Sequence, residues 1–258
     1  MPEPPPLGPA IVFLHGVGGA ARAWGPQLVS FAAAGFAPVA LDLPGYGARP
    51  PVERMQFDEL AADVEAAVAA RGLRRPVLVG HSLGGMVVQT LLRRRPHAYA
   101  AAVLACTSPA FGSPSGEFQR KFVADRLAPL RSGKSMCELA KDIIDGIVGP
   151  AANADGRALA VDCMAAVPAA TYRAAVQCLV GFDERANLAM IDVPVLCLAG
   201  EHDGNAPAPM MERMAGRIPG ARYVCLPAVG HLPNLEASAA FDRAVIEFLH
   251  SLPLVAAA

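Results

Sequence analysis

The amino-acid sequence predicts an α/β protein with a mostly parallel, doubly wound sheet. Short apolar runs that are typical of buried strands alternate with longer segments of helical periodicity, which is the pattern of successive βα units. The chain has 258 residues, of which 53% are hydrophobic, and this is enough to build one large core. Strands are expected at residues 10–15, 38–43, 76–80, 101–106, 194–199 and 221–226.

The helices between these strands have recognisable ends. Asp58 is expected to cap a helix that stops at Gly72, where the absence of a side chain favours a helix end. A second helix is expected over residues 83–95, because Pro96 cannot continue it. The last helix carries apolar residues on one face over residues 241–248 and should pack the C-terminal part of the chain against the sheet.

The alternation of strands and helices breaks between Ser108 and about Ala186. Helical patterns fill this stretch, and it contains no convincing strand. We therefore expect an inserted helical cap at residues 109–185 and a core formed by residues 1–108 and 186–258. Most aromatic and methionine side chains of the cap should form its own interior, and a minority should face a pocket.

Composition excludes several classes of partner. The 22 basic and 23 acidic residues give a formal net charge of -1, so there is no overall field to attract nucleic acid, and a small-molecule partner fits better. No apolar run approaches the roughly 18 residues of a membrane span, and the N-terminal residues lack the features of an export signal. Neither export nor a membrane span is therefore expected.

The cysteines and histidines indicate no metal and no disulfide scaffold. The six cysteines occur singly, and several lie inside apolar runs, so we expect them to be reduced and buried and the protein to be cytoplasmic. The six histidines lack the spacing of metal ligands. We expect neither a metal nor another cofactor.

Residues Gly80–Gly85 form the most informative stretch of the chain. They contain the pattern G-x-S-x-G directly behind an expected strand and ahead of an expected helix. The glycines permit a sharp turn that presents the hydroxyl of Ser82 at the end of the sheet, as in a nucleophile elbow. A serine becomes nucleophilic when a base takes its proton and an acid orients that base.

A candidate base and acid follow in the C-terminal half. Asp203 comes just after the expected strand at 194–199, and His231 comes just after the strand at 221–226. Glu201 and His202 compete with Asp203 for the role of the acid, but we expect both to point elsewhere. The carboxyl ends of parallel strands share one edge of a sheet, so Ser82, Asp203 and His231 can meet there.

With these segments the chain resembles α/β-hydrolase-fold enzymes over nearly its whole length. The resemblance implies that Ser82 is the nucleophile, His231 the general base and Asp203 the orienting acid. It also implies an oxyanion hole made by two backbone N–H groups. One belongs to Leu83, and the other to the glycine-rich loop after the first strand, most plausibly that of Val17.

One feature departs from that fold pattern. Enzymes of this fold usually begin with an antiparallel hairpin, but only nine residues, five of them proline, precede Ala10. We expect that hairpin to be missing, which would leave an apolar edge strand that a second copy of the chain could cover. The sequence therefore leaves a homodimer open.

The elbow residues discriminate among hydrolases of this fold. Ser82 disfavours the relatives that use a carboxylate as the nucleophile. His81 disfavours the C–C bond hydrolases, which commonly have asparagine at this position in the pattern G-N-S, and Leu83 disfavours the haloperoxidase-like members. The resemblance then implies hydrolysis of small or medium carboxylic esters through an acyl-enzyme. The C-terminal half is also similar to 3-oxoadipate enol-lactonase-like hydrolases, which take an anionic substrate. The basic residues that could bind its carboxylate are Arg120, Lys121, Arg126 and Arg173.

Three alternatives remain open. One is hydrolysis of an enol-lactone, and another is cleavage of a C–C bond in the degradation of aromatic compounds. The third belongs to a different class, a protein that binds a small molecule on the hydrolase scaffold without catalysis. A fluorophosphonate probe that labels serine nucleophiles would separate catalysis from binding.

Overall fold

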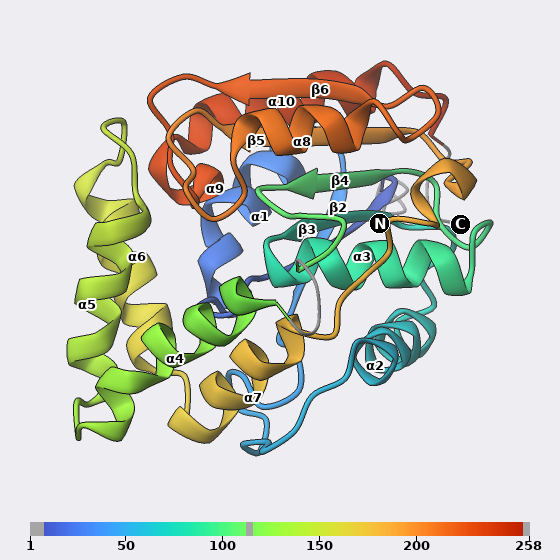
Figure 1. The fold of residues 1–258 in the computed structure, drawn as a ribbon. Coiled ribbons are helices and arrows are strands. Elements are labelled where there is room, and N and C mark those ends of the chain that lie inside the picture. Colours follow the sequence, from blue (N-terminus) through green and yellow to red (C-terminus); the bar gives the residue numbers. More distant parts are fainter. Residues whose placement is uncertain (1–7, 112–115, 255–258) are drawn as a thin grey trace, which may run out of the picture.

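A six-stranded sheet organises the computed structural model, which describes residues 8–111 and 116–254 (Figure 1). Its pairings are all parallel, and its strand order is β2-β1-β3-β4-β5-β6. The predicted fold class is therefore confirmed, and each strand lies within two residues of its expected range. The strands are β1 Ala10–Leu14, β2 Ala37–Leu41, β3 Val77–His81, β4 Ala102–Ala105, β5 Val195–Gly200 and β6 Arg222–Leu226.

Helices cover both faces of the sheet, as the doubly wound class requires. Behind the sheet in Figure 1 lie α1 and α10, and in front of it lie α2, α3 and α8. A short helix, α9, precedes α10 and follows the loop after β6. These helices span η1 Ala21–Trp24, α1 Gly25–Ala33, α2 Phe57–Ala70, α3 Leu83–Arg94, η2 Leu188–Met190, α8 Ala208–Ala215, α9 Pro233–Glu236 and α10 Ser238–His250.

The core divides along the alternation of the strand residues. In β1, Ile11 and Phe13 face α1 and α10, whereas Val12 and Leu14 face α2 and α3. All four side chains are completely buried, and so are those of Val77, Leu78 and Val79 in the neighbouring strand β3. Burial on both faces explains why these strands have continuous apolar sequences instead of an alternation of apolar and polar residues.

Four α-helices in the described residues between β4 and β5 stand beyond the sheet, on the side toward which β4 and β6 point (Figure 1). An antiparallel bridge between Ala110 and Asp183 joins the two ends of this segment. We refer to it as the α4–α7 segment. Its helices are α4 Glu117–Arg131, α5 Met136–Ile147, α6 Ala154–Ala165 and α7 Ala169–Leu179.

Two local predictions were wrong. Asp58 does not cap α2, because the helix already begins at Phe57, with Gln56 as its N-cap. The Asp58 carboxylate accepts a hydrogen bond from Arg93 at 2.7 Å. The cysteines are also not uniformly buried, since Cys137 and Cys225 are exposed. Cys225 lies on the edge strand β6, which pairs with β5 on one side only.

The opposite edge of the sheet agrees with the expected loss of the hairpin. From residue 8 onward no strand precedes β1, so β2 pairs on one side only and its first four residues are half-buried. No single helix within the described ranges is long and apolar enough to cross a membrane. By length and composition alone the pair α6 and α7, bent by 100°, passes the same test together.

Candidate active site

Ser82 occupies a strained turn between β3 and α3. Its φ of 53° and ψ of -117° lie in a region that residues with a side chain rarely adopt. A Cβ at Gly80 would lie 2.4 Å from the carbonyl oxygen of Gly84, and one at Gly84 would lie 2.3 Å from that of Leu14. The G-x-S-x-G pattern is therefore a steric requirement of this turn.

Neighbouring strand ends hold the backbone of this turn. The Ser82 N–H donates to the carbonyl of Ala105 at 3.0 Å, and the Thr107 hydroxyl donates to the Ser82 carbonyl at 2.8 Å. Both partners come from β4 or the residues directly after it. The strained conformation is thus fixed by hydrogen bonds to its own strand neighbours.

The three residues proposed from the sequence form one hydrogen-bonded chain. Ser82 Oγ lies 3.0 Å from His231 Nε2, and His231 Nδ1 lies 2.8 Å from Asp203 Oδ2. With the proton on Nδ1, the ring donates to Asp203 and accepts from the serine hydroxyl. This is the arrangement in which a histidine can take the serine proton while a carboxylate fixes its tautomer.

Asp203 is buried and kept ionised by its partners. Burial alone would raise the pKa of its carboxyl, but the charge of His231 and hydrogen bonds from His231, Ala206 and Asn205 lower the pKa below its usual value. The two backbone N–H groups donate to Oδ1 at 2.8 and 3.0 Å. The oxygen that faces His231 is therefore Oδ2, and the carboxylate cannot rotate away without losing both amides.

The glycine-rich loop after β1 passes directly beside Ser82. A turn closed by the Gly19 N–H on the Gly16 carbonyl, at 3.0 Å, places Val17 at its apex. A Cβ at Gly16 would lie 3.1 Å from the Ser82 Cβ, and the Tyr46 hydroxyl donates to the Val17 carbonyl at 2.9 Å. Leu83 is the first residue of α3, so its N–H has no acceptor within the helix.

Two neutral histidines support the loops around Ser82. Burial lowers the pKa of His15 to about 4 and that of His81 to about 3. Nε2 of His15 accepts a hydrogen bond from the Leu43 N–H at 3.2 Å, and its Nδ1–H donates to the Gly16 carbonyl at 2.8 Å. His81 Nε2 donates to the carbonyl oxygen of His231 at 2.6 Å. No local pattern in the sequence predicts this contact, which joins residues 150 positions apart.

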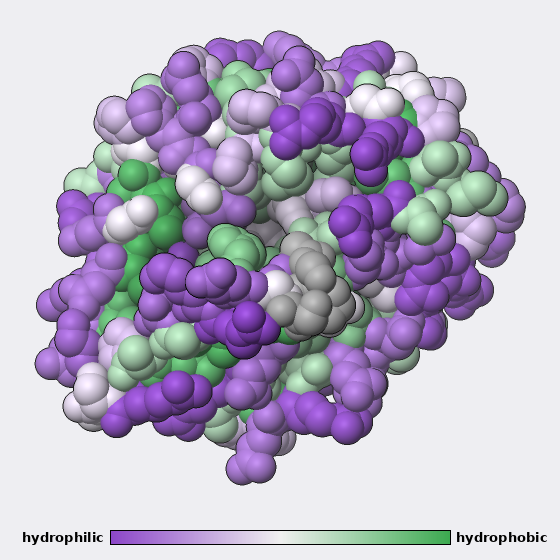
Figure 2. Space-filling view, viewed as in Figure 1, coloured by the Kyte–Doolittle hydropathy of each residue, from purple (hydrophilic) through white to green (hydrophobic). Residues whose placement is uncertain are grey.

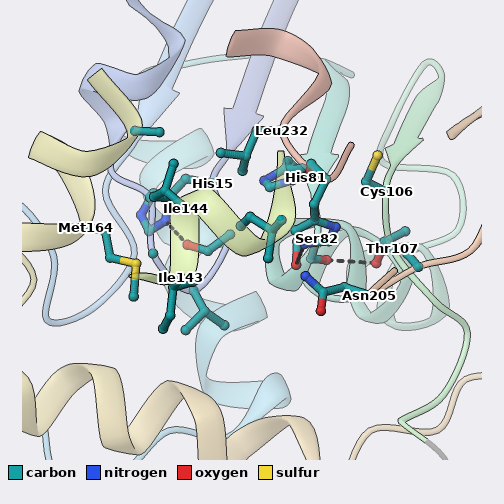
Figure 3. Close-up of a pocket in the computed structure, with 18 of the residues that line it drawn as sticks. His15, His81, Ser82, Cys106, Thr107, Ile143, Ile144, Met164, Asn205 and Leu232 are labelled. Atoms are coloured by element: carbon teal, nitrogen blue, oxygen red, sulfur yellow. Dashed lines mark hydrogen bonds between the residues drawn. The ribbon is translucent and has the colours of Figure 1, made fainter. Parts of the chain in front are cut away.

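An apolar pocket opens above Ser82. In Figure 3, Ser82, Thr107 and Asn205 gather on one side, and Ile143, Ile144 and Met164 stand on the other. The α4–α7 segment also contributes Phe118, Phe122, Arg126, Ile147, Ala160, Cys163, Tyr172, Val176 and Leu179 to the wall. Hydrophilic residues predominate on the outer face in Figure 2, and hydrophobic ones show on the left, where α5 and α6 lie.

Arg126 brings a charge to this pocket. Among the described residues it is the one lysine, arginine, aspartate or glutamate side chain that lines the pocket. Its guanidinium lies 5.1 Å from the centre of the Phe122 ring, and Nη2 donates to Asn205 Oδ1 at 3.1 Å. The other basic residues expected from the sequence, Lys121, Arg120 and Arg173, do not line the pocket.

The competing candidates point away from Ser82. The Glu201 carboxylate is exposed and accepts from the Ala228 N–H at 2.8 Å, and the ring of His202 is half exposed. His97 pairs with Asp192 on the surface, and His250 stacks on Phe36. The positions of Glu201 and His202 agree with the expectation that both point elsewhere.

Cys106, Asp203 and His231 could hold a metal ion by geometry, because their ligand atoms lie within 4.8 Å of one another. Two chemical facts oppose this use. Asp203 and His231 are already hydrogen-bonded to each other, and burial raises the pKa of the Cys106 thiol well above its usual value. A thiol that keeps its proton is a poor metal ligand. The donor set therefore suits a proton relay better than a metal.

The fold and this hydrogen-bonded chain define the protein as a member of the α/β class of hydrolases. Residues 11–244 match the model of the "Alpha/beta hydrolase family", and the chain belongs to that family. It is 31% identical over 251 residues to the "Putative carbamate hydrolase RutD" of Variovorax paradoxus, and the alignment covers 95% of this chain and 93% of the relative.

Two further relatives carry different names. The crystal structure of the enol-lactonase from Burkholderia xenovorans LB400 has a TM-score of 0.83 and 25% identity, with 94% of this chain and 92% of that chain covered. The "Putative non-heme bromoperoxidase BpoC" of Mycobacterium tuberculosis is 27% identical over 267 residues, with 95% of each chain covered. The family is thereby shown, whereas its members differ in the reactions that their names state.

Proposed function

We propose that this hydrolase cleaves carboxylic esters through an acyl-enzyme on Ser82. The observation that carries the proposal is the chain of hydrogen bonds from Ser82 through His231 to Asp203, set at the base of an apolar pocket. Such a pocket accommodates the apolar part of a small or medium ester and excludes water from the reaction. The α4–α7 segment would act as the cap that shapes it.

The reaction would proceed in two steps. Ser82 Oγ attacks the ester carbonyl carbon while its proton passes to His231 Nε2, and the alcohol leaves with that proton. Water then attacks the acyl-enzyme, gives its proton to His231 and releases the acid, and the proton returns to Ser82. The backbone N–H groups of Val17 and Leu83 would stabilise the oxyanion in both steps, each contributing about 10²–10³ in rate.

A direct test compares serine variants on p-nitrophenyl esters of increasing acyl length. Ser82→Ala should abolish turnover and labelling by a fluorophosphonate while leaving the circular dichroism spectrum unchanged. Ser132→Ala, at the exposed end of α4, is the matched control and should retain both. Labelling without turnover of any ester or carbamate would favour another acyl substrate, and absence of labelling would favour the binding protein without catalysis.

Arg126 favours a second candidate, the hydrolysis of an anionic lactone. A lactone is an internal ester, so the same residues could open it, and a guanidinium beside the pocket could bind a carboxylate on the substrate. Arg126→Gln should then reduce kcat/KM for a carboxylate-bearing enol-lactone by about tenfold or more, while kcat/KM for a neutral ester changes little. Equal losses on both substrates would remove this candidate.

A further inference from the structure

A single buried carboxylate holds the backbone on both sides of His231. Glu236 Oε2 accepts from the N–H of Gly230, and Oε1 accepts from the N–H of Leu232, each at 2.7 Å. Only 2% of Glu236 is exposed. The residue before His231 and the residue after it are therefore fixed to one rigid group at the end of α9.

The same carboxylate also reaches the α4–α7 segment. Oε2 accepts a third amide, the N–H of Gly149 just after α5, at 2.7 Å. The two loops are joined by further backbone bonds, since the His231 N–H donates to the Ile147 carbonyl and the Ala151 N–H to the Ala228 carbonyl, both at 2.8 Å. The histidine loop and the end of α5 therefore form one hydrogen-bonded unit.

The backbones of the histidine loop and of the residues after α5 are also in close steric contact. A Cβ at Gly149 would lie 2.6 Å from the Ala228 carbonyl oxygen, and one at Gly230 would lie 2.4 Å from that of Ile147. Both glycines are required because two backbones touch here. The Asn153 amide adds bonds to the carbonyls of Leu235 and Glu236, at 2.9 and 3.0 Å.

The chemistry of Glu236 suits this place better than that of any neutral side chain. An ionised carboxylate only accepts hydrogen bonds, and here three backbone N–H groups donate to it. Within the described ranges no lysine or arginine forms an ion pair with Glu236. The three amides are therefore what compensates the buried charge, and their loss would leave that charge unsatisfied.

We propose that Glu236 is a positioning residue that holds the His231 ring in reach of Ser82 and Asp203 and ties that placement to the end of α5. His231 has two ring bonds to satisfy at once, at 3.0 and 2.8 Å, and a backbone shift would break one of them. A displacement of about 1 Å in a catalytic group can cost about 10²-fold in rate. The proposal rests on the role of His231 given above.

The test compares Glu236→Gln with Glu201→Gln, since each glutamate accepts backbone N–H groups beside the same loop. Glutamine has the shape of glutamate but turns one acceptor into a donor, which would then face a backbone N–H. For Glu236→Gln we expect kcat to fall by about 10- to 100-fold with KM changed less than about twofold, at a temperature where the variant is fully folded. Glu201→Gln should retain both parameters.

A second readout separates positioning from stability. In wild type the proton between His231 Nδ1 and Asp203 should give a low-field resonance in the proton NMR spectrum, and Glu236→Gln should shift or broaden it. A variant that only unfolds more easily would keep the resonance and the wild-type kcat while folded, and that result would overturn the proposal. If Ser82→Ala remained active, the proposed function would fail, whereas the NMR result would still report on Glu236.

The wild-type protein provides a measurement that does not depend on any variant folding. Hydrogen exchange should be slow at the amides of Gly149, Gly230 and Leu232, and the three should open together, because one carboxylate accepts all of them. Exchange of these amides at the rate of an exposed loop would contradict the proposal directly.

Discussion

The two sides of the pocket are fixed by different kinds of contact. At the sheet end, backbone groups and short side chains hold Ser82 and His231, and glycines allow the loops to touch. On the opposite side, the wall consists of apolar side chains such as Ile144, Met164 and Phe122, which are held by packing. Hydrogen-bonded geometry therefore determines the chemistry, and side-chain volume determines what fits.

This contrast implies different responses to substitution. A change at the sheet end disturbs distances of about 3 Å that the reaction requires, so activity should fall without a change in substrate preference. A change in the wall leaves those distances intact and alters the space beside them. It should change the preference among substrates and leave the chemistry in place.

The strongest test of the sheet end is Asp203→Asn. The amide keeps the size of the carboxylate but cannot hold the His231 proton on Nδ1, so kcat should fall by about 10⁴-fold with the fold intact. Measurements of kcat and of the thermal melting curve check this. If Asp203→Asn stayed active while Glu201→Gln lost activity, the acid would be Glu201, and the hydrogen bond between Asp203 and His231 would not be required for the reaction.

Acid should destabilise the sheet end through its neutral histidines. Burial lowers the pKa of His15 to about 4 and that of His81 to about 3, whereas a histidine in the unfolded chain titrates near about 6.5. Between these values the unfolded chain binds more protons than the folded one. The free energy of unfolding should therefore fall as the pH drops below about 6.5, by about 1.4 kcal/mol per pH unit for each histidine.

Urea denaturation between about pH 7 and about pH 5 measures this slope. His81→Asn removes one of the two groups, so its slope should be smaller by about one proton than that of wild type. The same slope in both proteins would mean that His81 is protonated in the folded state as well, in conflict with its burial.

Sequence predicted the sheet end well because its requirements are local. The strained φ of Ser82 demands small neighbours, and so the turn appears in the sequence as glycines at fixed spacing. Buried strands appear in the sequence as apolar runs, and for this reason Asp203 and His231 could be assigned to the residues just after β5 and β6.

The side chains that form the apolar wall, and the contacts that connect the α4–α7 segment to the loop of His231, could not be predicted from the sequence in this way. Arg126 was one of four basic residues named from the sequence, but nothing local distinguished it from Arg120, Lys121 and Arg173. Only the packing of α4 against α7 turns it toward the pocket. The Glu236 carboxylate accepts a hydrogen bond from the N–H of Gly149, which is 87 positions away, and no local sequence pattern connects the two residues. Contacts between loops that are far apart in the chain depend on single, widely separated residues, and these form no recognisable pattern in the sequence.

The joint between the two sides can be tested with a pair of glycines at the end of α5. Gly149→Ala would press a methyl group against the backbone of the histidine loop, and we expect a loss of about 1–3 kcal/mol in the free energy of unfolding. A Cβ at Gly146 meets nothing within 4 Å, and this position is helical, so Gly146→Ala should add about 0.5–1 kcal/mol. Chemical denaturation measures both, and a neutral effect of Gly149→Ala would show that the loops can separate.

The smallest expected effect concerns the wall alone. Ile143 is half-buried and lines the pocket opposite Ser82 (Figure 3), so Ile143→Ala should lengthen the space for the acyl chain. The ratio of kcat/KM for a long acyl ester to that for a short one should rise by about tenfold, because a few methylene groups in an apolar pocket discriminate on this scale.

The control for the wall is Val161→Ala, which removes apolar volume from α6 at a half-buried position that does not line the pocket. It should leave the chain-length ratio unchanged. If both variants changed the ratio equally, the preference would depend on the general packing of the α4–α7 segment. If Ile143→Ala lowered turnover of every ester alike, side-chain volume in the wall would be controlling the chemistry as well, and the separation between the two sides would not hold.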